Sequence, residues 1–202
     1  MIYPGSNEQI FGHVTYSQHG EDLFLLNLFT LMGIDKPSYL DIGAHKPYTI
    51  SNTALFYSRG SSGVCVEANP SLIYEFNRER SRDRVINAGV AAVAGTIAEG
   101  HPVTETKEIE MITINDVVRL YCGGVWPDLL CMDIEGFDCE VLNSAQFYKN
   151  GQEAGPKVIC TEIRIPDAYF VKVFMGHRGY HSLCRIMSNL IFVRSDFIDK
   201  VT

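Results

Sequence analysis

The sequence lacks several features that would each have indicated a familiar class of protein. It has no excess of positive charge, because 17 Lys and Arg stand against 24 Asp and Glu, and the net charge of −7 disfavours nucleic acid as a partner. No run reaches the ~18 apolar residues of a membrane span, and the first residues lack the basic and apolar regions of a signal peptide. We therefore expect a cytoplasmic protein without a membrane span.

The cysteines form no C-x-x-C pair. Of the 6 cysteines, Cys65, Cys131 and Cys160 lie inside apolar runs, where Cys behaves as a small buried hydrophobe. This pattern favours a reducing compartment over a disulfide framework.

The length and composition fit one globular domain. With 202 residues, of which 46% are hydrophobic, the chain can bury a sizeable core and is too short for a second full domain. We expect residues 1–35 to form an N-terminal cap segment and helix, and residues 36–202 to form one α/β unit.

Strand and helix patterns alternate along the chain. Four apolar runs are typical of buried parallel strands, and each ends on a carboxylate: Tyr39–Asp41, Val64–Glu67, Leu129–Asp133 and Val158–Glu162. The expected elements are helices at 21–32, about 51–59, 70–80, from 114, 138–145 and 167–176, strands at 38–42, 63–67, 84–88, 128–133, 157–162, 180–185 and 189–194, and a hairpin-like region at about 90–112. The tight connection between the last two strands favours antiparallel pairing. The pattern predicts an α/β fold whose mostly parallel sheet ends in an antiparallel hairpin.

The most basic stretch, residues 78–84, alternates arginines with acidic residues in a helical pattern. We interpret it as a solvated helix end, with a phosphate-binding patch as the alternative.

Polar residues follow three successive strand ends in the first half of the chain. Asp41 and Gly43 follow the first strand, Glu67 ends the second, and Asn87 closes the third. Open α/β sheets bind ligands outside the carboxyl ends of their strands, so these residues should line one crevice. There Glu67 could accept both hydroxyls of a ribose and Asn87 could bind an adenine edge, while the helix start near Ser51 offers N–H groups to a carboxylate. The competing interpretation is that Asp41 caps a turn and Gly43 breaks a strand.

The glycine pattern disfavours a nicotinamide dinucleotide. That cofactor prefers G-x-G-x-x-G around its pyrophosphate, and here the residues after Gly43 are Ala, His, Lys and Pro. S-adenosylmethionine has no pyrophosphate, so the sequence favours it over NAD.

The sequence resembles the FkbM-type family of S-adenosylmethionine-dependent methyltransferases, in particular the members associated with sugar and polysaccharide modification. The matching segments, in the family's order, are residues 16–22 (YSQHGED), 39–45 (YLDIGAH) with Pro47, 51–53 (SNT) with Phe56 and Tyr57, 66–70 (VEANP), 87–90 (NAGV), 132–137 (MDIEGF) with Val141 and Leu142, and 156–163 (PKVICTEI). The tail 189–193 (NLIFV) is also similar, whereas His45-Lys46-Pro47 replaces the Asn-x-Gly of other branches.

The resemblance implies a single Rossmann-like domain with helices on both faces and a seven-stranded sheet in the order 3-2-1-4-5-7-6, with the seventh strand antiparallel. It implies that residues 41–52 hold the methionine part of the cofactor, Glu67 the ribose and Asn87 or its neighbours the adenine, while residues 18–21 close over it. The implied cofactor-binding residues are Gln18, Glu21, Asp41, Gly43, Ala44, His45, Ser51, Asn52, Glu67, Ala68, Asn87 and Asp133.

Three further acids are candidates for the chemistry. Asp133 and Glu135 lie at the end of the fourth strand, and Glu162 ends the fifth. In a doubly wound sheet those strand ends flank the position of the methyl group of the bound cofactor. An alcohol acceptor needs a base, which Asp133 or Glu162 could supply. Alternatively the three carboxylates bind Mg²⁺, which would lower the pKa of the acceptor hydroxyl, or Glu135 is only a helix N-cap. We favour metal-free chemistry.

The aromatic residues offer one further hypothesis. Tyr169 and Phe170 could stack on a sugar ring, whereas Trp126, beside Pro127, is better explained by packing at the start of a strand.

The function that these patterns favour is an O-methyltransferase that uses S-adenosylmethionine on a hydroxyl of a sugar, glycan or related small molecule. The alternative is a non-catalytic nucleoside-binding module of the same fold. The sequence names neither the acceptor nor the oligomeric state.

Overall fold

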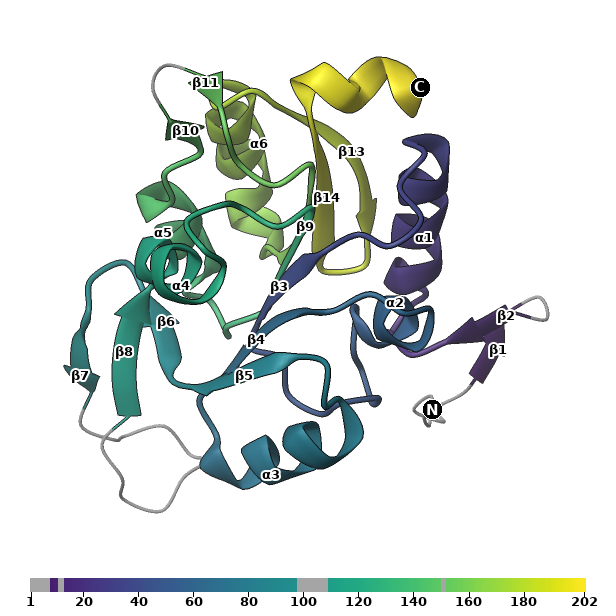
Figure 1. Ribbon diagram of the computed structural model, residues 1–202. Helices are drawn as coiled ribbons and strands as arrows, with labels where there is room; N and C mark the ends of the chain where they lie inside the picture. Colours follow the sequence, from purple (N-terminus) through teal and green to yellow (C-terminus); the bar gives the residue numbers. More distant parts are fainter. Residues whose placement is uncertain (1–7, 11–12, 98–108, 150–151) are drawn as a thin grey trace.

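The protein is built around one twisted sheet (Figure 1). The computed structural model describes residues 8–10, 13–97, 109–149 and 152–202. In spatial order the central sheet consists of β13 (Tyr180–Ile186), β14 (Asn189–Arg194), β12 (Val158–Glu162), β9 (Leu129–Met132), β3 (Tyr39–Ile42), β4 (Gly63–Glu67) and β5 (Arg84–Asn87). When the seven strands are numbered along the chain and read from β5 to β13, this is the order 3-2-1-4-5-7-6. β14 is antiparallel to both of its neighbours and the other pairs are parallel, so the fold class is confirmed.

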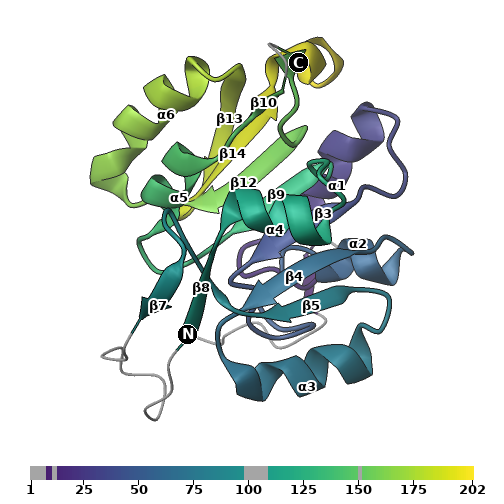
Figure 2. The same ribbon diagram turned by 60° about the vertical axis from the view of Figure 1, so that its left-hand side comes forward.

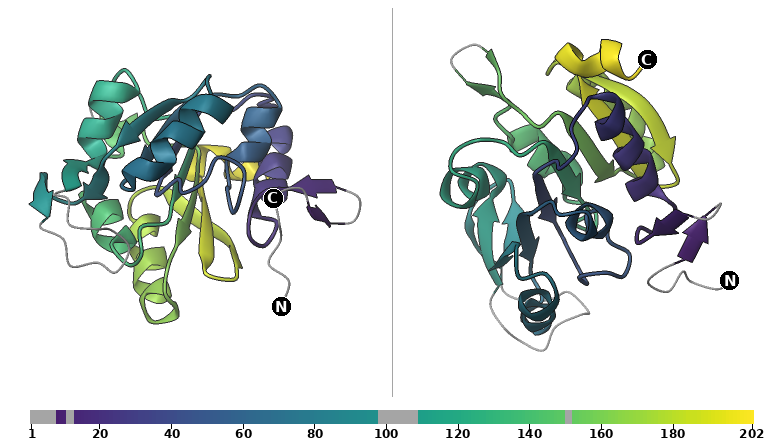
Figure 3. Two further views of the ribbon diagram at one scale, coloured as in Figure 1. Left: turned by 90° about the horizontal axis from the view of Figure 1, so that it is seen from below. Right: turned by 45° about the vertical axis from the view of Figure 1, so that its right-hand side comes forward.

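Helices cover both faces of the sheet (Figures 2 and 3). On one face lie α1 (Glu21–Leu31), α2 (Ala54–Ser58) and α3 (Pro70–Glu79), and on the other α4 (Ile114–Tyr121), α5 (Asp138–Ser144) and α6 (Ala168–Gly176). Phe29 of α1, Phe56 of α2 and Phe76 of α3 share one apolar layer with alternate strand residues. The sheet thus lies between two apolar layers. No helix in the described part of the chain is long and apolar enough to cross a membrane.

Smaller elements surround this core. The region expected as a hairpin at about 90–112 is a three-stranded sheet in the order β6 (Gly89–Ala91), β8 (Ile109–Thr113), β7 (Gly95–Ile97). β7 and β8 are antiparallel as expected, whereas β6 runs parallel to β8, and residues 98–108 lie outside the described residues. The other elements are the antiparallel pairs β1 (Glu8–Ile10) with β2 (His13–Thr15) and β10 (Tyr148–Lys149) with β11 (Gln152–Glu153), and 3-10 helices at Ile165–Asp167 and Ser195–Lys200.

Local side-chain chemistry sets several helix ends. Thr113 Oγ1 accepts a hydrogen bond from the N–H of Asp116 at 3.1 Å, as expected of an N-cap. Asn69 Oδ1 accepts from the N–H of Ser71 at 3.0 Å, and Pro70 occupies the first position of α3, where its missing N–H has no cost.

The basic stretch 78–84 differs from its interpretation as a solvated helix end. The Arg78 side chain is exposed, but that of Arg80 is 0% exposed and pairs with Asp83 at 2.7 Å. The interpretation is therefore wrong for Arg80, because the chain turns inward after α3 and buries the guanidinium among the rings of Tyr39, Tyr57 and Phe76.

Candidate active site

Three of the predicted acids lie in one row at the carboxyl edge of the sheet. Ile42 pairs with Val66 on one side and with Met132 on the other, and Met132 pairs with Thr161. The next residue of each strand therefore falls in the next row, which contains Glu67, Gly43, Asp133 and Glu162. We call Glu67, Asp133 and Glu162 the acid row. It is flanked by Asn87, which pairs with Glu67, and by Asn189, which pairs with Glu162.

The acid row points to one face of the sheet. Cys65, Cys131 and Cys160 belong to the apolar layer under α1, α2 and α3. Glu67, Asp133 and Glu162 each follow one of these cysteines by two residues, and alternate residues of a strand share a face. The three carboxylates therefore project to the same side of the sheet, as a shared crevice requires.

Asp41 lies deeper than the acid row. It pairs with Cys65 and Cys131, two residues before the row, and is 6% exposed. Its carboxylate accepts a 2.5 Å hydrogen bond from Thr53 Oγ1. Burial raises the pKa of Asp41 to about 6, against the lowering effects of Thr53 and of the Arg80 charge. The expectation that Asp41 lines the crevice at the level of Gly43, Glu67 and Asn87 is therefore wrong, and its cofactor contact stays a prediction.

Glu67 is held by the backbone. Its two carboxylate oxygens accept hydrogen bonds from the N–H of His45 at 2.8 Å and from the N–H of Asn69 at 2.7 Å. Because each carboxylate oxygen has a second lone pair, the group can still accept the two hydroxyls of a ribose. The neighbouring Ala68 is partly exposed at the same strand end.

Gly43 allows two strand ends to approach closely. Its φ of +76° lies in the left-handed region, and a Cβ added there would be 1.9 Å from the carbonyl oxygen of Asp133. The N–H groups of Gly43 and of the buried Ala44 both donate to the carbonyl oxygen of Val66. The chain therefore turns at Gly43, and what approaches the glycine in this structure is the backbone of the neighbouring strand end.

Asn87 holds the chain at the end of β4. Its amide nitrogen donates to the carbonyl oxygens of Glu67 and Ala68, both at 3.0 Å. The amide nitrogen is therefore occupied within the protein and is not free to donate to adenine. An adenine contact through the Asn87 oxygen stays a prediction.

The start of α2 is capped from within the protein. The N–H of Ser51 donates to the carbonyl oxygen of Tyr16 at 2.9 Å, and Ser51 Oγ accepts from the N–H of Ala54 at 3.2 Å. These two amides are not free for a carboxylate ligand, in contrast to the expectation of open N–H groups there. Asn52, between them, is partly exposed.

The N-terminal segment reaches the other end of the acid row. Glu21 is fully buried and accepts hydrogen bonds from the side chain of Asn189 at 3.0 Å and from the N–H of His19 at 2.8 Å. Asn189 pairs with Glu162, so the start of α1 lies beside the acid row. Gln18 is exposed in the same segment, and cofactor binding by Gln18 and Glu21 stays a prediction.

Asp133 and Glu162 form a carboxylate pair. The pKa of Asp133 is raised to about 7. The largest cause is that surrounding atoms displace water from its carboxyl, although the residue is exposed; the neighbouring Glu162 adds charge repulsion and accepts a hydrogen bond from the protonated Asp133 carboxyl. Two carboxyl groups so close favour a state with one shared proton. The pair thus contains one group able to take a proton near neutral pH.

Asp138, which the sequence analysis did not single out, shapes the loop between Asp133 and α5. Its buried carboxylate accepts from the N–H groups of Ile134 at 3.3 Å and Gly136 at 3.2 Å, and burial raises its pKa to about 6. Glu135 is exposed with φ +57° and lies outside the start of α5, so its interpretation as the N-cap is wrong. An acid at the first position of the helix was the signal available in the sequence.

The acids do not assemble a metal site in the described residues, where no group of three or more His, Cys, Asp or Glu side chains could hold an ion. A hollow of about 20 Å³ beside Glu162, enough for one water, is lined by Gly136, Asp138, Cys139, Glu162, Ile163, Arg164 and Asp167.

The aromatic candidates differ in their environments. The indole N–H of Trp126 donates to the carbonyl oxygen of Gln146, and its ring packs on Phe147 at 5.1 Å, which confirms the packing role. Tyr169 and Phe170 on α6 are 81% and 68% exposed.

Comparison with known proteins defines the fold. No family model matches the sequence, and no curated protein matches it. A "putative RNA methyltransferase" from Pyrococcus horikoshii is similar in structure, with a TM-score of 0.51 and 15% identity over 93% of this chain and 91% of that one. A "putative caffeoyl-CoA O-methyltransferase" from Staphylococcus aureus gives 0.51 and 10% over 86% and 82%. A "putative hemolysin" from Streptococcus thermophilus gives 0.50 and 11% over 91% and 69%. The chain therefore has the Rossmann-like α/β fold that these structures share.

Proposed function

We propose that the protein is an S-adenosylmethionine-dependent methyltransferase that methylates a hydroxyl of a sugar, glycan or related small molecule. The observation that carries this proposal is the acid row, which presents Glu67 at one end and the Asp133–Glu162 pair at the other on one face of the sheet. Two of the similar structures carry the descriptions "putative RNA methyltransferase" and "putative caffeoyl-CoA O-methyltransferase", which supports the same class of reaction.

The donor pattern of the site fits this cofactor better than a dinucleotide. The N–H groups of Gly43, Ala44, His45, Ser51 and Ala54 donate to acceptors within the protein. A pyrophosphate cradle instead directs such groups toward the ligand. Glu67, oriented by two amides, suits a ribose diol, and this combination favours a nucleoside without a pyrophosphate.

The carboxylate pair supplies the base. When bound, S-adenosylmethionine would supply a methyl group on a sulfonium, so that the C–S bond breaks with its electron pair left on sulfur as a C–O bond forms. In this chain, Asp133 and Glu162 would orient the acceptor hydroxyl and take its proton as the oxygen attacks. A base with a pKa near 7 is well matched to this task because it is partly ionised at neutral pH and still binds the proton.

The identity of the acceptor rests on two further arguments. The ordered motifs between residues 16 and 163 support assignment to the FkbM-type family and its sugar-modifying branch. The exposed rings of Tyr169 and Phe170, which follow β12 and therefore Glu162, offer flat apolar surfaces for a sugar ring. We place the reaction in the cytoplasm, since all the cysteines are free thiols.

The alternative to an enzyme is a non-catalytic nucleoside-binding module of the same fold. Calorimetry with S-adenosylhomocysteine and with NAD tests the cofactor, and transfer of tritiated methyl groups to a panel of sugars and other alcohols tests catalysis. We expect binding of the former ligand, none of NAD, and label on an acceptor hydroxyl. Tight binding without transfer to any acceptor would favour the binding module, and binding of NAD alone would overturn the proposal.

A further inference from the structure

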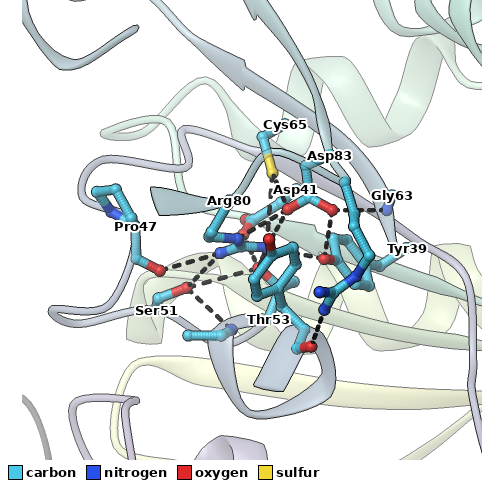
Figure 4. A network of polar contacts seen from close by, with 12 residues as sticks. Tyr39, Asp41, Pro47, Ser51, Thr53, Gly63, Cys65, Arg80 and Asp83 are labelled. Carbon is cyan, nitrogen blue, oxygen red and sulfur yellow. Dashed lines mark hydrogen bonds and ion pairs between the residues drawn. The ribbon is translucent and has the colours of Figure 1, made fainter. Parts of the chain in front are cut away.

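The loop that leads from β3 to α2 is anchored by one buried arginine (Figure 4). Arg80, just after α3, is fully buried. Its Nε donates to Asp83 at 2.7 Å, and Asp83 in turn accepts from the hydroxyl of Tyr39 at 2.7 Å and from the N–H of Gly63 at 2.9 Å. The charge is therefore neutralised and the guanidinium is fixed to the strands β3 and β4.

The other guanidinium nitrogens point at the loop. Nη1 donates to the carbonyl oxygen of Pro47 at 3.1 Å and to Ser51 Oγ at 3.3 Å, and Nη2 donates to Thr53 Oγ1 at 3.0 Å. The Thr53 hydroxyl in turn donates a hydrogen bond to the carboxylate of Asp41. Residues 43–53, which we call the cofactor loop, are thus held at three points by a single side chain.

The cofactor loop needs such an anchor because two of its residues are strained. His45 has a φ of +52° and Ile50 a φ of +55°, in the left-handed region that is unfavourable for a residue other than glycine and most unfavourable for a β-branched one. Pro47 lies two residues after His45, and Ser51 comes directly after Ile50, so Arg80 binds the chain within two residues of each strained position. His45 in turn presents its N–H to Glu67.

We propose that Arg80 is a positioning residue that holds the cofactor loop in its ligand-binding conformation before the ligand arrives. This inference rests on the proposed function, because it assumes that the loop and Glu67 bind the nucleoside. A planar guanidinium reaches several acceptors in fixed directions, whereas an ammonium is a single point charge. Arginine is therefore needed for the geometry, and lysine would keep only the charge.

The rings around Arg80 strengthen the fixation. The guanidinium carbon lies 5.5, 5.2 and 5.3 Å from the ring centres of Tyr39, Tyr57 and Phe76. These rings restrict the side chain to one position and exclude water from it, so the hydrogen bonds to the loop are made in a dry environment, where they are stronger.

The test compares Arg80→Lys with Arg178→Lys. Arg178 is a matched control, because it also donates to three backbone carbonyl oxygens, those of Leu142, Asn143 and Ala145, but at the end of α5. Both variants are measured by calorimetry with S-adenosylhomocysteine, by hydrogen exchange without ligand and by kcat at saturating cofactor.

We expect Arg80→Lys to raise the Kd about tenfold. If the loop adopts its binding conformation only a tenth of the time, the apparent affinity for the ligand falls to a tenth. Exchange should rise in residues 43–53, while kcat at saturation stays within about threefold of the wild type. Arg178→Lys should change neither the Kd nor exchange in that loop. A folded Arg80→Lys protein with an unchanged Kd and unchanged loop exchange would overturn the proposal.

If Arg80→Lys does not fold, Thr53→Val provides the second test. It removes one acceptor of Arg80 without changing the volume of the side chain, and we expect about a threefold rise in Kd with faster exchange in residues 43–53. Unchanged binding and exchange would overturn the role of Arg80. A wild-type protein that binds no S-adenosylhomocysteine would instead overturn the proposed function, while the exchange measurement still reports whether Arg80 holds the loop.

Discussion

The two ends of the acid row use the same functional group in different ways. At one end Glu67 faces backbone N–H groups, which orient its carboxylate and suit it to accept hydrogen bonds from a ligand. At the other end Asp133 faces a second carboxyl group, and burial together with this repulsion raises its pKa to about 7. The difference teaches that the partners of a carboxylate, rather than its position at a strand end, decide whether it is suited to binding or to proton transfer.

The broadest effect is expected from Gly43→Ala, which should disturb both ends. The added Cβ would clash with the carbonyl oxygen of Asp133 and force a left-handed alanine, so we expect a loss of about 3 kcal/mol in the free energy of unfolding. Gly33→Ala is the control, because Gly33 has a similar φ of +73° and open space around it, and should cost about 1 kcal/mol. Urea unfolding measures both, and equal losses would contradict the close approach at Gly43.

Asp133→Asn should distinguish the functions of the two ends, because it removes the base and leaves Glu67 unchanged. We expect kcat to fall about 10²- to 10⁴-fold, while the Kd for S-adenosylhomocysteine stays within about threefold. Glu140→Gln, an exposed acid on α5, serves as the control for a change of charge. Steady-state kinetics and calorimetry provide the two readouts, and a nearly unchanged kcat would mean that the pair is not the base.

Glu67→Gln should give the opposite result. The amide places a donor against one of the backbone N–H groups and weakens the contact with a ribose, so we expect the Kd to rise about 10- to 100-fold. At saturating cofactor, kcat should remain close to that of the wild type. The same two measurements apply, and a fall in kcat without a change in Kd would reverse the roles of the two ends.

The pH dependence of the rate should follow the carboxylate pair. Its base form is lost on protonation, so kcat/KM should rise with pH through about 7 and level off above it. A rate that is constant between pH 5 and 8 would contradict this assignment.

The free energy of unfolding should fall with rising pH because of the buried acids, whereas kcat/KM should rise. Folding raises the pKa of Asp41 and of Asp138 to about 6, so the native state holds protons that the unfolded chain has lost. Their contribution is present below the unfolded pKa of roughly 4 and is lost as pH rises through about 6. Asp41→Asn should therefore reduce the fall in Tm between pH 5 and pH 8, and thermal unfolding at both pH values checks this.

The smallest effect is expected from chelation. If the pair acts without a metal, activity after treatment with EDTA should stay within about twofold of the untreated protein. Loss of activity that Mg²⁺ restores would favour the alternative in which Asp133, Glu135 and Glu162 bind the ion.

The sequence was most informative where a local rule applied. The helix expected from 114 begins there, with Thr113 as its N-cap, and apolar runs that end on acids identified the parallel strands and their polar ends. The sequence was least informative about how deeply a polar side chain is buried. Arg80, in a stretch that resembles a solvated helix end, is fully buried, and Asp41 lies one layer below the rim. The pattern of charges along a chain does not reveal whether a charged side chain will face the solvent or the interior of the folded protein.

By itself the sequence determined the order of the central strands and of the helices that cover them, the polar residues at the strand ends and the absence of a dinucleotide glycine pattern, because these depend on periodicity and on neighbours along the chain. Only the tertiary structure decided which acids share a row, that Asp133 meets Glu162, and that Arg80 anchors the cofactor loop. These relations depend on strand register and on contacts between residues far apart in the chain. Sequence spacing does not encode them, and only the packed sheet and helices bring those groups together.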